Sequence, residues 1–280
     1  MLLFVLSADS LEMPHFGDCH GGVPKNDLRI PVNNASLSQQ GLDETTFNRT
    51  LDKIQDYFGK NGRRIVVERR WSNEQVNAFA MIDKTGAKKI WVMGGLARHP
   101  AMTEDALLVI SCHEVGHHYG AAPRRTGLTR DNWASVEGQS DYYASFKCLK
   151  EIFADEDNAS ALQDRRIDPF ADAQCSAAYS DPKGALLCLR SVTAGQELAV
   201  FFAALESAEP PRLETPDPTR VLETLESHSR AQCRLDTLFQ GALCPIGWEE
   251  RLSSSHPLIN VCHSKSGHSN GARPQCWFKE

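Results

Sequence analysis

The sequence predicts an α+β fold, in which a small antiparallel sheet packs on one long apolar helix and the C-terminal half is mostly helical. Three observations support this expectation. Two short segments rich in β-type residues, at 76–80 and 88–96, are separated by a turn. An apolar run without proline follows at 106–119. Helical patterns then dominate the later chain, as in 183–207.

One amphipathic helix and one further strand are expected before these segments. The stretch 43–60 carries apolar residues at helical spacing, which predicts a helix with one face in the core. These residues are Phe47, Leu51, Ile54 and Phe58. RRIVVERR at 63–70 is typical of a strand. Near the other end, a proline-rich connection at 209–218 leads to another helix.

The long helix has recognisable ends. Thr103 is a suitable N-cap, and Glu104 and Asp105 place two acids at the positive end of the helix dipole. Gly120 suits a C-terminal stop. Because the helix is so apolar, it must be buried, and its histidines are expected to face the wall of a cleft.

Two histidines of this helix belong to the pattern HEVGH at 113–117. His113 and His117 lie at i and i+4 on one helical face, with Glu114 on the flank. Twenty residues later, Glu137 opens the pattern EGQSD, and Asp141 follows one turn on. Two imidazoles and one carboxylate fill three tetrahedral positions of zinc and leave the fourth for water. The sequence therefore predicts one catalytic Zn²⁺.

A second helix, from Trp133 to about Phe153, is expected to carry Glu137 and Asp141 side by side. Asp141 would then hydrogen-bond the ring nitrogen of His113 that does not bind the metal. The pattern HExxH is short, so a surface helix with hydrogen-bonded histidines is the alternative. His118 points about 100° away from His117 on a helical wheel and is not expected to be a ligand.

These residues predict peptide-bond hydrolysis. Zinc lowers the pKa of bound water, and Glu114 is expected to take the proton of that water and pass it to the leaving amine. A secreted binding protein that keeps zinc only for stability is one alternative. A structural site has no use for a base, so Glu114 argues against it. An amide hydrolase acting on cell-wall peptide is another alternative, since motifs do not describe specificity.

HEVGH and EGQSD, preceded by VNAFA and KKIWVMGGL, resemble the CAAX prenyl endopeptidase and HtpX-like family of gluzincin zinc metallopeptidases. The resemblance covers roughly residues 64–150, and residues 217–240 more weakly. It implies a zincin-like fold, zinc endopeptidase activity, and a peptide or protein as substrate.

The family also has a His-Pro segment with an arginine six residues after the histidine. His228 and Arg234 have this spacing, but Ser229 stands where the proline is expected. By the resemblance, His228 or Arg234 stabilises the oxyanion. A solvated helix position is the alternative for His228. The strand 88–93 would be the sheet edge to which an extended substrate pairs, although an ordinary core strand fits its alternation equally well.

Nine cysteines indicate an oxidising compartment. Three short loops could be closed by disulfides, namely Cys175 with Cys188, Cys233 with Cys244, and Cys262 with Cys276. Cys19, Cys112 and Cys148 remain, and at least one must be unpaired or joined to another chain. Cys112 is expected to be a buried thiol rather than a fourth metal ligand. The set Cys262, His263, His268 and Cys276 could bind a second metal, and a disulfide-closed loop is favoured there.

MLLFVLSA at the start resembles the end of a signal-peptide apolar region, with a short buried strand as the alternative. With the cysteines, it predicts an exported protein, periplasmic or extracellular. The expected organisation is a leader remnant in 1–20, a metallopeptidase domain in 21–245 and a cysteine-rich tail in 246–280. A net charge of −6 gives no basic surface for nucleic acid. No apolar run approaches the roughly 18 residues of a membrane span, so a soluble form is expected.

Overall fold

The computed structural model describes residues 21–32, 41–60, 62–126, 132–268 and 270–280, and it confirms an α+β architecture. The elements follow the order α1 (Glu44–Lys60), β1 (Val66–Arg70), β2 (Ala78–Ile82), β3 (Lys88–Met93), α2 (Gly94–Ala97), α3 (Glu104–Tyr119), α4 (Glu137–Tyr143), a π-helical turn (Ala144–Cys148), α5 (Leu149–Phe153), α6 (Asn158–Leu162), α7 (Pro169–Ala178), α8 (Pro182–Glu206), α9 (Ala231–Leu243) and a 3₁₀ turn (Ser264–Ser266). The predicted leader segment 1–20 lies outside the described residues.

The sheet is small and mixed, with strand order β1-β3-β2. β3 pairs in parallel with β1 and in antiparallel fashion with β2. The prediction of an antiparallel sheet with residues 88–93 at its edge is therefore wrong. β2 and β3 form a hairpin, and β1 pairs on the far side of β3, so β3 is central and β2 is an edge strand. Alternating apolar residues show that a strand is half covered, but they do not show which strand has two neighbours.

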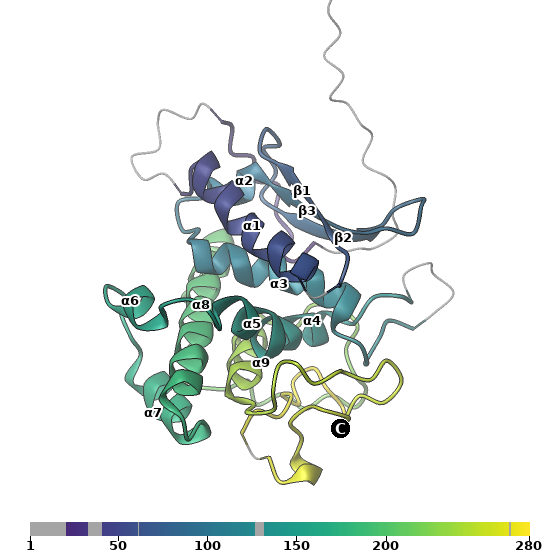
Figure 1. Ribbon diagram of the computed structural model, residues 1–280, viewed down its shortest axis with the longest axis vertical. Helices are drawn as coiled ribbons and strands as arrows, with labels where there is room; N and C mark the ends of the chain where they lie inside the picture. The colour runs from purple at the N-terminus through teal and green to yellow at the C-terminus, as the bar shows by residue number, and fades with distance from the viewer. Residues whose placement is uncertain (1–20, 33–40, 61, 127–131, 269) are drawn as a thin grey trace, which may run out of the picture.

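Helix α3 lies at the centre of the molecule, between the sheet and the helices of the later chain (Figure 1). It contacts α1, β2, β3, α4 and α8. The predicted N-cap is confirmed, because the Thr103 side chain accepts a hydrogen bond from the backbone N–H of Ala106. Its residues from Asp105 to His118 are all buried. The apolar face predicted for α1 is also confirmed and packs against this core.

The second helix differs from its prediction at its start and in its middle. Residues 132–134 form a turn and a bend, Ser135 forms a β-bridge with Arg124, and Val136 is extended. The helix begins at Glu137, and a π-helical turn from Ala144 to Cys148 interrupts it before α5 continues to Phe153. The prediction of a continuous helix from Trp133 is wrong, because the chain turns at 132–134 and bridges to Arg124 through Ser135 before the helix begins.

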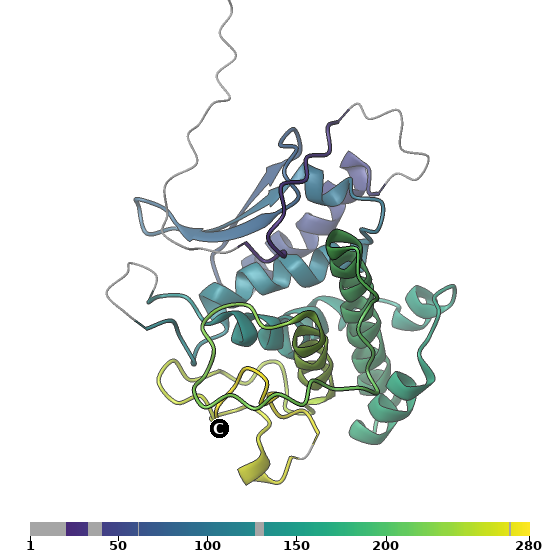
Figure 2. The same ribbon diagram turned by 180° about the vertical axis from the view of Figure 1, so that it is seen from behind.

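In the C-terminal half, helices alternate with irregular segments as far as Leu243, and α8 and α9 pack side by side. α8 is long and apolar enough to cross a membrane by length and composition, in contrast to the expectation that no segment is. However, 72% of its most apolar window is buried inside the protein, as in the core helix of a water-soluble protein. Segments 207–230 and 244–280 have little regular structure, and the tail folds back beneath α4 and α9 (Figures 1 and 2).

Four disulfides join the cysteines of the described residues. Cys175–Cys188 is confirmed, whereas the other two predicted pairs are wrong. The tail crosses α9, so Cys276 reaches Cys233 and Cys262 reaches Cys244. Cys112 was expected to be a free buried thiol, but it is bonded to Cys148. Loop length shows only that two cysteines could meet, and the fold selects partners more distant in sequence. The disulfides are compatible with an oxidising, exported location. Cys19 lies outside the described residues.

Candidate metal centre

The three predicted ligands converge. His113 and His117 project from one face of α3, and Glu137 is the first residue of α4. All three are buried, and their ligand atoms lie within 4.8 Å of one another. Glu137 Oε2 is 3.1 Å from His113 Nε2 and 3.4 Å from His117 Nε2. These residues could hold one metal ion.

Two buried polar atoms at the centre of this group lack a hydrogen-bond partner, as is expected of a metal site without its ion. His113 Nε2 and Glu137 Oε2 are buried and have no hydrogen-bond partner. Leaving such atoms unpaired costs about 1–3 kcal/mol each, and more for a charged group. A cation bound between them would supply the missing partner for both. The donor set therefore fits a metal.

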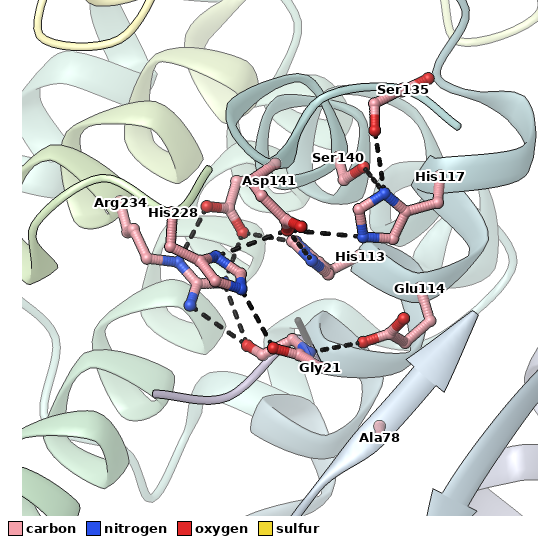
Figure 3. Close-up of polar contacts among 12 residues, drawn as sticks. Gly21, Ala78, His113, Glu114, His117, Ser135, Ser140, Asp141, His228 and Arg234 are labelled. Atoms are coloured by element: carbon pink, nitrogen blue, oxygen red, sulfur yellow. Dashed lines mark hydrogen bonds and ion pairs between the residues drawn. The ribbon is translucent and has the colours of Figure 1, made fainter. Parts of the chain in front are cut away.

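Each of these three side chains also makes a hydrogen bond through a second polar atom. His113 Nδ1 lies 2.7 Å from Asp141 Oδ1, as predicted for Asp141, while His117 Nδ1 lies 2.9 Å from the carbonyl oxygen of Ser135 (Figure 3). In both cases the ring nitrogen that faces away from the site carries the proton, which leaves each Nε2 free to bind a cation. Glu137 Oε1 accepts a hydrogen bond of 2.6 Å from Arg125.

The charges around the space favour a bound cation. Burial alone would lower the pKa of His113, but the carboxylates of Asp141 and Glu137 raise it to about 10. Burial opposes ionisation of Glu137, yet the neighbouring imidazoles keep its pKa well below its usual value. Without a metal, the raised pKa means that His113 carries a proton on Nε2, the atom that faces the candidate metal position. A divalent cation and a proton therefore compete for the same nitrogen.

Gly116 allows the two ligand-bearing helices to approach closely. A Cβ at Gly116 would lie 2.8 Å from Ser140 Cα and 2.9 Å from the Ser140 carbonyl oxygen. Both distances are shorter than real Cβ contacts, and the neighbours are backbone atoms that cannot move alone. The glycine of HEVGH thus brings α3 against α4, so that Glu137 reaches the histidines.

Glu114 faces the same space without belonging to the ligand set. It is buried, and burial is the main cause that raises the pKa of its carboxyl. Its Oε1 accepts a 2.8 Å hydrogen bond from the backbone N–H of Gly22. A small cavity is lined by Glu114, His117 and Glu137 together with Phe79 and Ala80 of β2. The edge strand is therefore one wall of the candidate site.

His228 and Arg234 also reach the site, from the opposite side (Figure 3). Arg234 of α9 is buried and binds both oxygens of Asp141, at 2.9 Å each. His228 lies in the loop before α9, so the alternative interpretation that it is a solvated helix residue is wrong. Burial, reinforced by Arg234, lowers the pKa of His228 to about 4, and the ring is neutral at neutral pH. Its Nδ1 lies 3.4 Å from Glu137 Oε2.

Among the residues that the structure describes, the other histidines and cysteines singled out from the sequence take no part. His118 contacts the carbonyl oxygen of Lys89 through Nε2 and stacks on Trp133, away from the ligands. The predicted second metal set fails because Cys262 and Cys276 are both in disulfides. The same holds for the grouping of Asp217 with Cys233 and Cys276.

Sequence reasoning missed Arg125, Ser135 and the backbone of Gly21 and Gly22. A backbone carbonyl carries no residue-type signature, and Arg125 belongs to one of several arginine pairs that resemble solvated surface positions. The doublet Gly21–Gly22 was the one available indication of close backbone approach. Comparisons with protein-family models, curated proteins and solved structures find no match to this chain.

Proposed function

We propose that the protein is a zinc-dependent endopeptidase with a zincin-like site, in which His113, His117 and Glu137 bind the ion and Glu114 is the general base. The observation that carries the proposal is the position of Glu114, buried beside the ligands but outside their set. Two histidines and one carboxylate are a typical donor set for catalytic zinc, and they leave one coordination position open.

Glu114, His228 and Asp141 have separate roles in the proposed hydrolysis. Zinc, when bound, activates a water molecule and polarises the substrate carbonyl. Glu114 accepts a proton from that water and delivers it to the leaving nitrogen. His228, neutral and bearing its proton on Nε2, donates to the carbonyl oxygen that gains negative charge. Asp141 holds the His113 ring in its metal-binding orientation and neutralises the charge of Arg234.

An extended substrate would pair with β2, the edge strand beside the cavity. The strand offers backbone groups such as the Ala78 carbonyl oxygen, which accepts a hydrogen bond from the Gly22 N–H. Backbone pairing of this type gives affinity without selecting a sequence. Selectivity then depends on the space around each substrate Cβ.

The resemblance to the CAAX prenyl endopeptidase and HtpX-like family supports the same reaction. The disulfides favour a soluble, exported member that acts in the periplasm or outside the cell. A non-catalytic protein stabilised by zinc would gain nothing from burying Glu114, whose desolvation has a cost. An amide hydrolase acting on cell-wall peptide would use the same residues, so substrate profiling decides between peptidase and amidase.

The test is a cleavage profile. The zinc-loaded protein is incubated with a peptide library derived from a whole proteome and, separately, with cell-wall peptides. We expect internal cleavage of ordinary peptides, absent after chelation and in Glu114→Gln. Cleavage confined to cell-wall peptides would replace endopeptidase by amidase. No cleavage of either, at full zinc occupancy, would contradict the proposal.

A further inference from the structure

The backbone of Gly21 and Gly22 occupies the candidate active site. The Gly21 carbonyl oxygen lies 3.0 Å from His228 Nε2. The Gly22 N–H donates to Glu114 Oε1 at 2.8 Å and to the Ala78 carbonyl oxygen at 3.3 Å. The Gly22 carbonyl oxygen accepts two 3.1 Å hydrogen bonds from Arg234. Figure 3 shows this backbone between Glu114 on one side and His228 with Arg234 on the other.

The segment that follows Gly22 runs antiparallel to the residues that lead into β2. Arg29 forms an antiparallel bridge with Gln75, and the Ile30 N–H donates to the Glu74 carbonyl oxygen at 2.8 Å. In Figure 2 this purple segment begins over α3 and runs away from it beside the sheet. The segment is thus held along the approach to β2 and, at Gly22, against β2 itself, where an extended substrate would pair.

Two of the proposed catalytic side chains contact opposite ends of one peptide bond. A proton donor faces the carbonyl oxygen of Gly21, and the proposed base faces the nitrogen of Gly22. A bond held in this manner has the proximity that converts a slow bimolecular reaction into an intramolecular one. Both glycines are buried, so the segment also excludes any other peptide from the site.

We propose that the Gly21–Gly22 peptide bond is a self-processing site, the first substrate of the protein's own active centre. The inference rests on the proposed peptidase function. The oxygen of water bonds to the Gly21 carbonyl carbon, and the bond between that carbon and the Gly22 nitrogen breaks. Glu114 carries one water proton to the Gly22 nitrogen. The products are a segment ending in the Gly21 carboxylate and a chain that begins with the Gly22 amino group.

The contacts explain why glycine stands at both positions. A Cβ on Gly21 would lie 2.1 Å from Asn77 Oδ1 and 2.6 Å from the Ala78 carbonyl oxygen. A Cβ on Gly22 would lie 2.5 Å from Glu114 Oε1. The Glu114 side chain could adjust, but the Ala78 carbonyl belongs to a paired strand. A side chain at position 21 would therefore push the peptide bond away from the base, and the site selects glycine before the cleaved bond.

The experiment follows the mass and the N-terminus of the full chain. Wild type, Glu114→Gln, Gly21→Val and the control Gly59→Ala are expressed through an export pathway and purified with zinc. Gly59→Ala is a suitable control for Gly21→Val, because it also adds a side chain to a glycine but its Cβ meets no atom within 4 Å. Wild type and Gly59→Ala are expected to begin at Gly22. Glu114→Gln and Gly21→Val are expected to retain this bond while binding as much zinc as wild type, which shows that both remain folded.

Other outcomes overturn the inference in distinguishable ways. If Glu114→Gln also begins at Gly22, another protease makes the cut. If the wild-type chain keeps the Gly21–Gly22 bond but cleaves added peptides, self-processing is wrong and the proposed function stands. If wild type cleaves neither itself nor any peptide at full zinc occupancy, the proposed function fails first. Processing at a rate independent of protein concentration is expected for an intramolecular reaction, and a rate that rises with concentration would contradict it.

Discussion

Cys112 and Cys148 form a disulfide that joins the helix of His113 to the helical segment that begins with Glu137, with their Cα atoms 5.7 Å apart. Cys112 directly precedes His113 of the candidate metal site, and Cys148 ends the π-helical turn. π-helical turns within α-helices are frequent at functional sites. The bond therefore fixes the distance between the two elements that supply the three candidate ligands.

Removal of this disulfide is expected to affect both stability and metal binding. Cys112→Ala with Cys148→Ala opens a loop of 36 residues, which should lower the free energy of unfolding by roughly 4 kcal/mol in the chain-entropy model. Zinc affinity should fall as well, because α3 and α4 can separate. The control is Cys175→Ala with Cys188→Ala, which opens a loop of 13 and should cost roughly 3 kcal/mol with zinc affinity unchanged. Equal zinc affinity in both variants, measured by competition with a chelator, would contradict the role of the first disulfide.

Asp141 is predicted to tune the metal through His113. Asp141→Asn removes the charge that orients the ring and should weaken zinc binding about 10- to 100-fold. It also leaves buried Arg234 without its ion-pair partner, so a loss of stability should accompany it. Asp172→Asn, an exposed change on α7, serves as control. Unchanged zinc affinity in Asp141→Asn would show that the contact does not support the metal.

The cysteine-rich tail is expected to stabilise α4, the helix that begins at Glu137. Trp277 is fully buried, and a Cβ on Gly138, the neighbour of Glu137, would lie 2.2 Å from its indole ring. Trp277→Ala should lower the free energy of unfolding by about 3–5 kcal/mol. Gly138→Ala should destabilise too, since the ring is held by its surroundings. Denaturant unfolding of both variants checks this, and wild-type midpoints would mean that the tail unfolds independently.

His99 is predicted to contribute to loss of stability in acid. Its ring packs against Phe201, its Nδ1 accepts a hydrogen bond from the Ala101 N–H, and burial lowers its pKa. The unfolded state therefore takes up a proton first, so this contribution is complete above the unfolded pKa near 6.5 and is lost as the pH falls below it. His99→Asn keeps an acceptor and cannot titrate. In chelator, its unfolding free energy should fall less steeply than that of wild type below pH 6.5, by at most about 1.4 kcal/mol per pH unit. Exposed His256→Asn should follow wild type, and parallel curves for His99→Asn would contradict the prediction.

The sequence predicted residues that do converge in a possible metal site, and the spacing within each helix is a local property. One helical turn places His113 beside His117, and the next turn of a second helix places Asp141 behind His113. The sheet order was not predictable in this way, since Ile90 and Val92 alternate equally well in an edge strand and in a central one. Disulfide partners such as Cys233 and Cys276 depend on the path of the whole tail. The backbone of Gly22 against Glu114 depends on contacts 92 residues apart, which no local pattern encodes.

The most direct test of a catalytic zinc centre compares wild type with Glu114→Gln at measured zinc occupancy. Both proteins act on one peptide that the wild-type protein cleaves. Glu114 is not a ligand, so both proteins are expected to bind about one zinc per chain, while His113→Ala with His117→Ala should bind none. The rate of Glu114→Gln should fall by at least about 100-fold, as expected for loss of a general base. Wild-type turnover by zinc-loaded Glu114→Gln, or full zinc occupancy in the double histidine variant, would contradict a catalytic zinc centre at these residues.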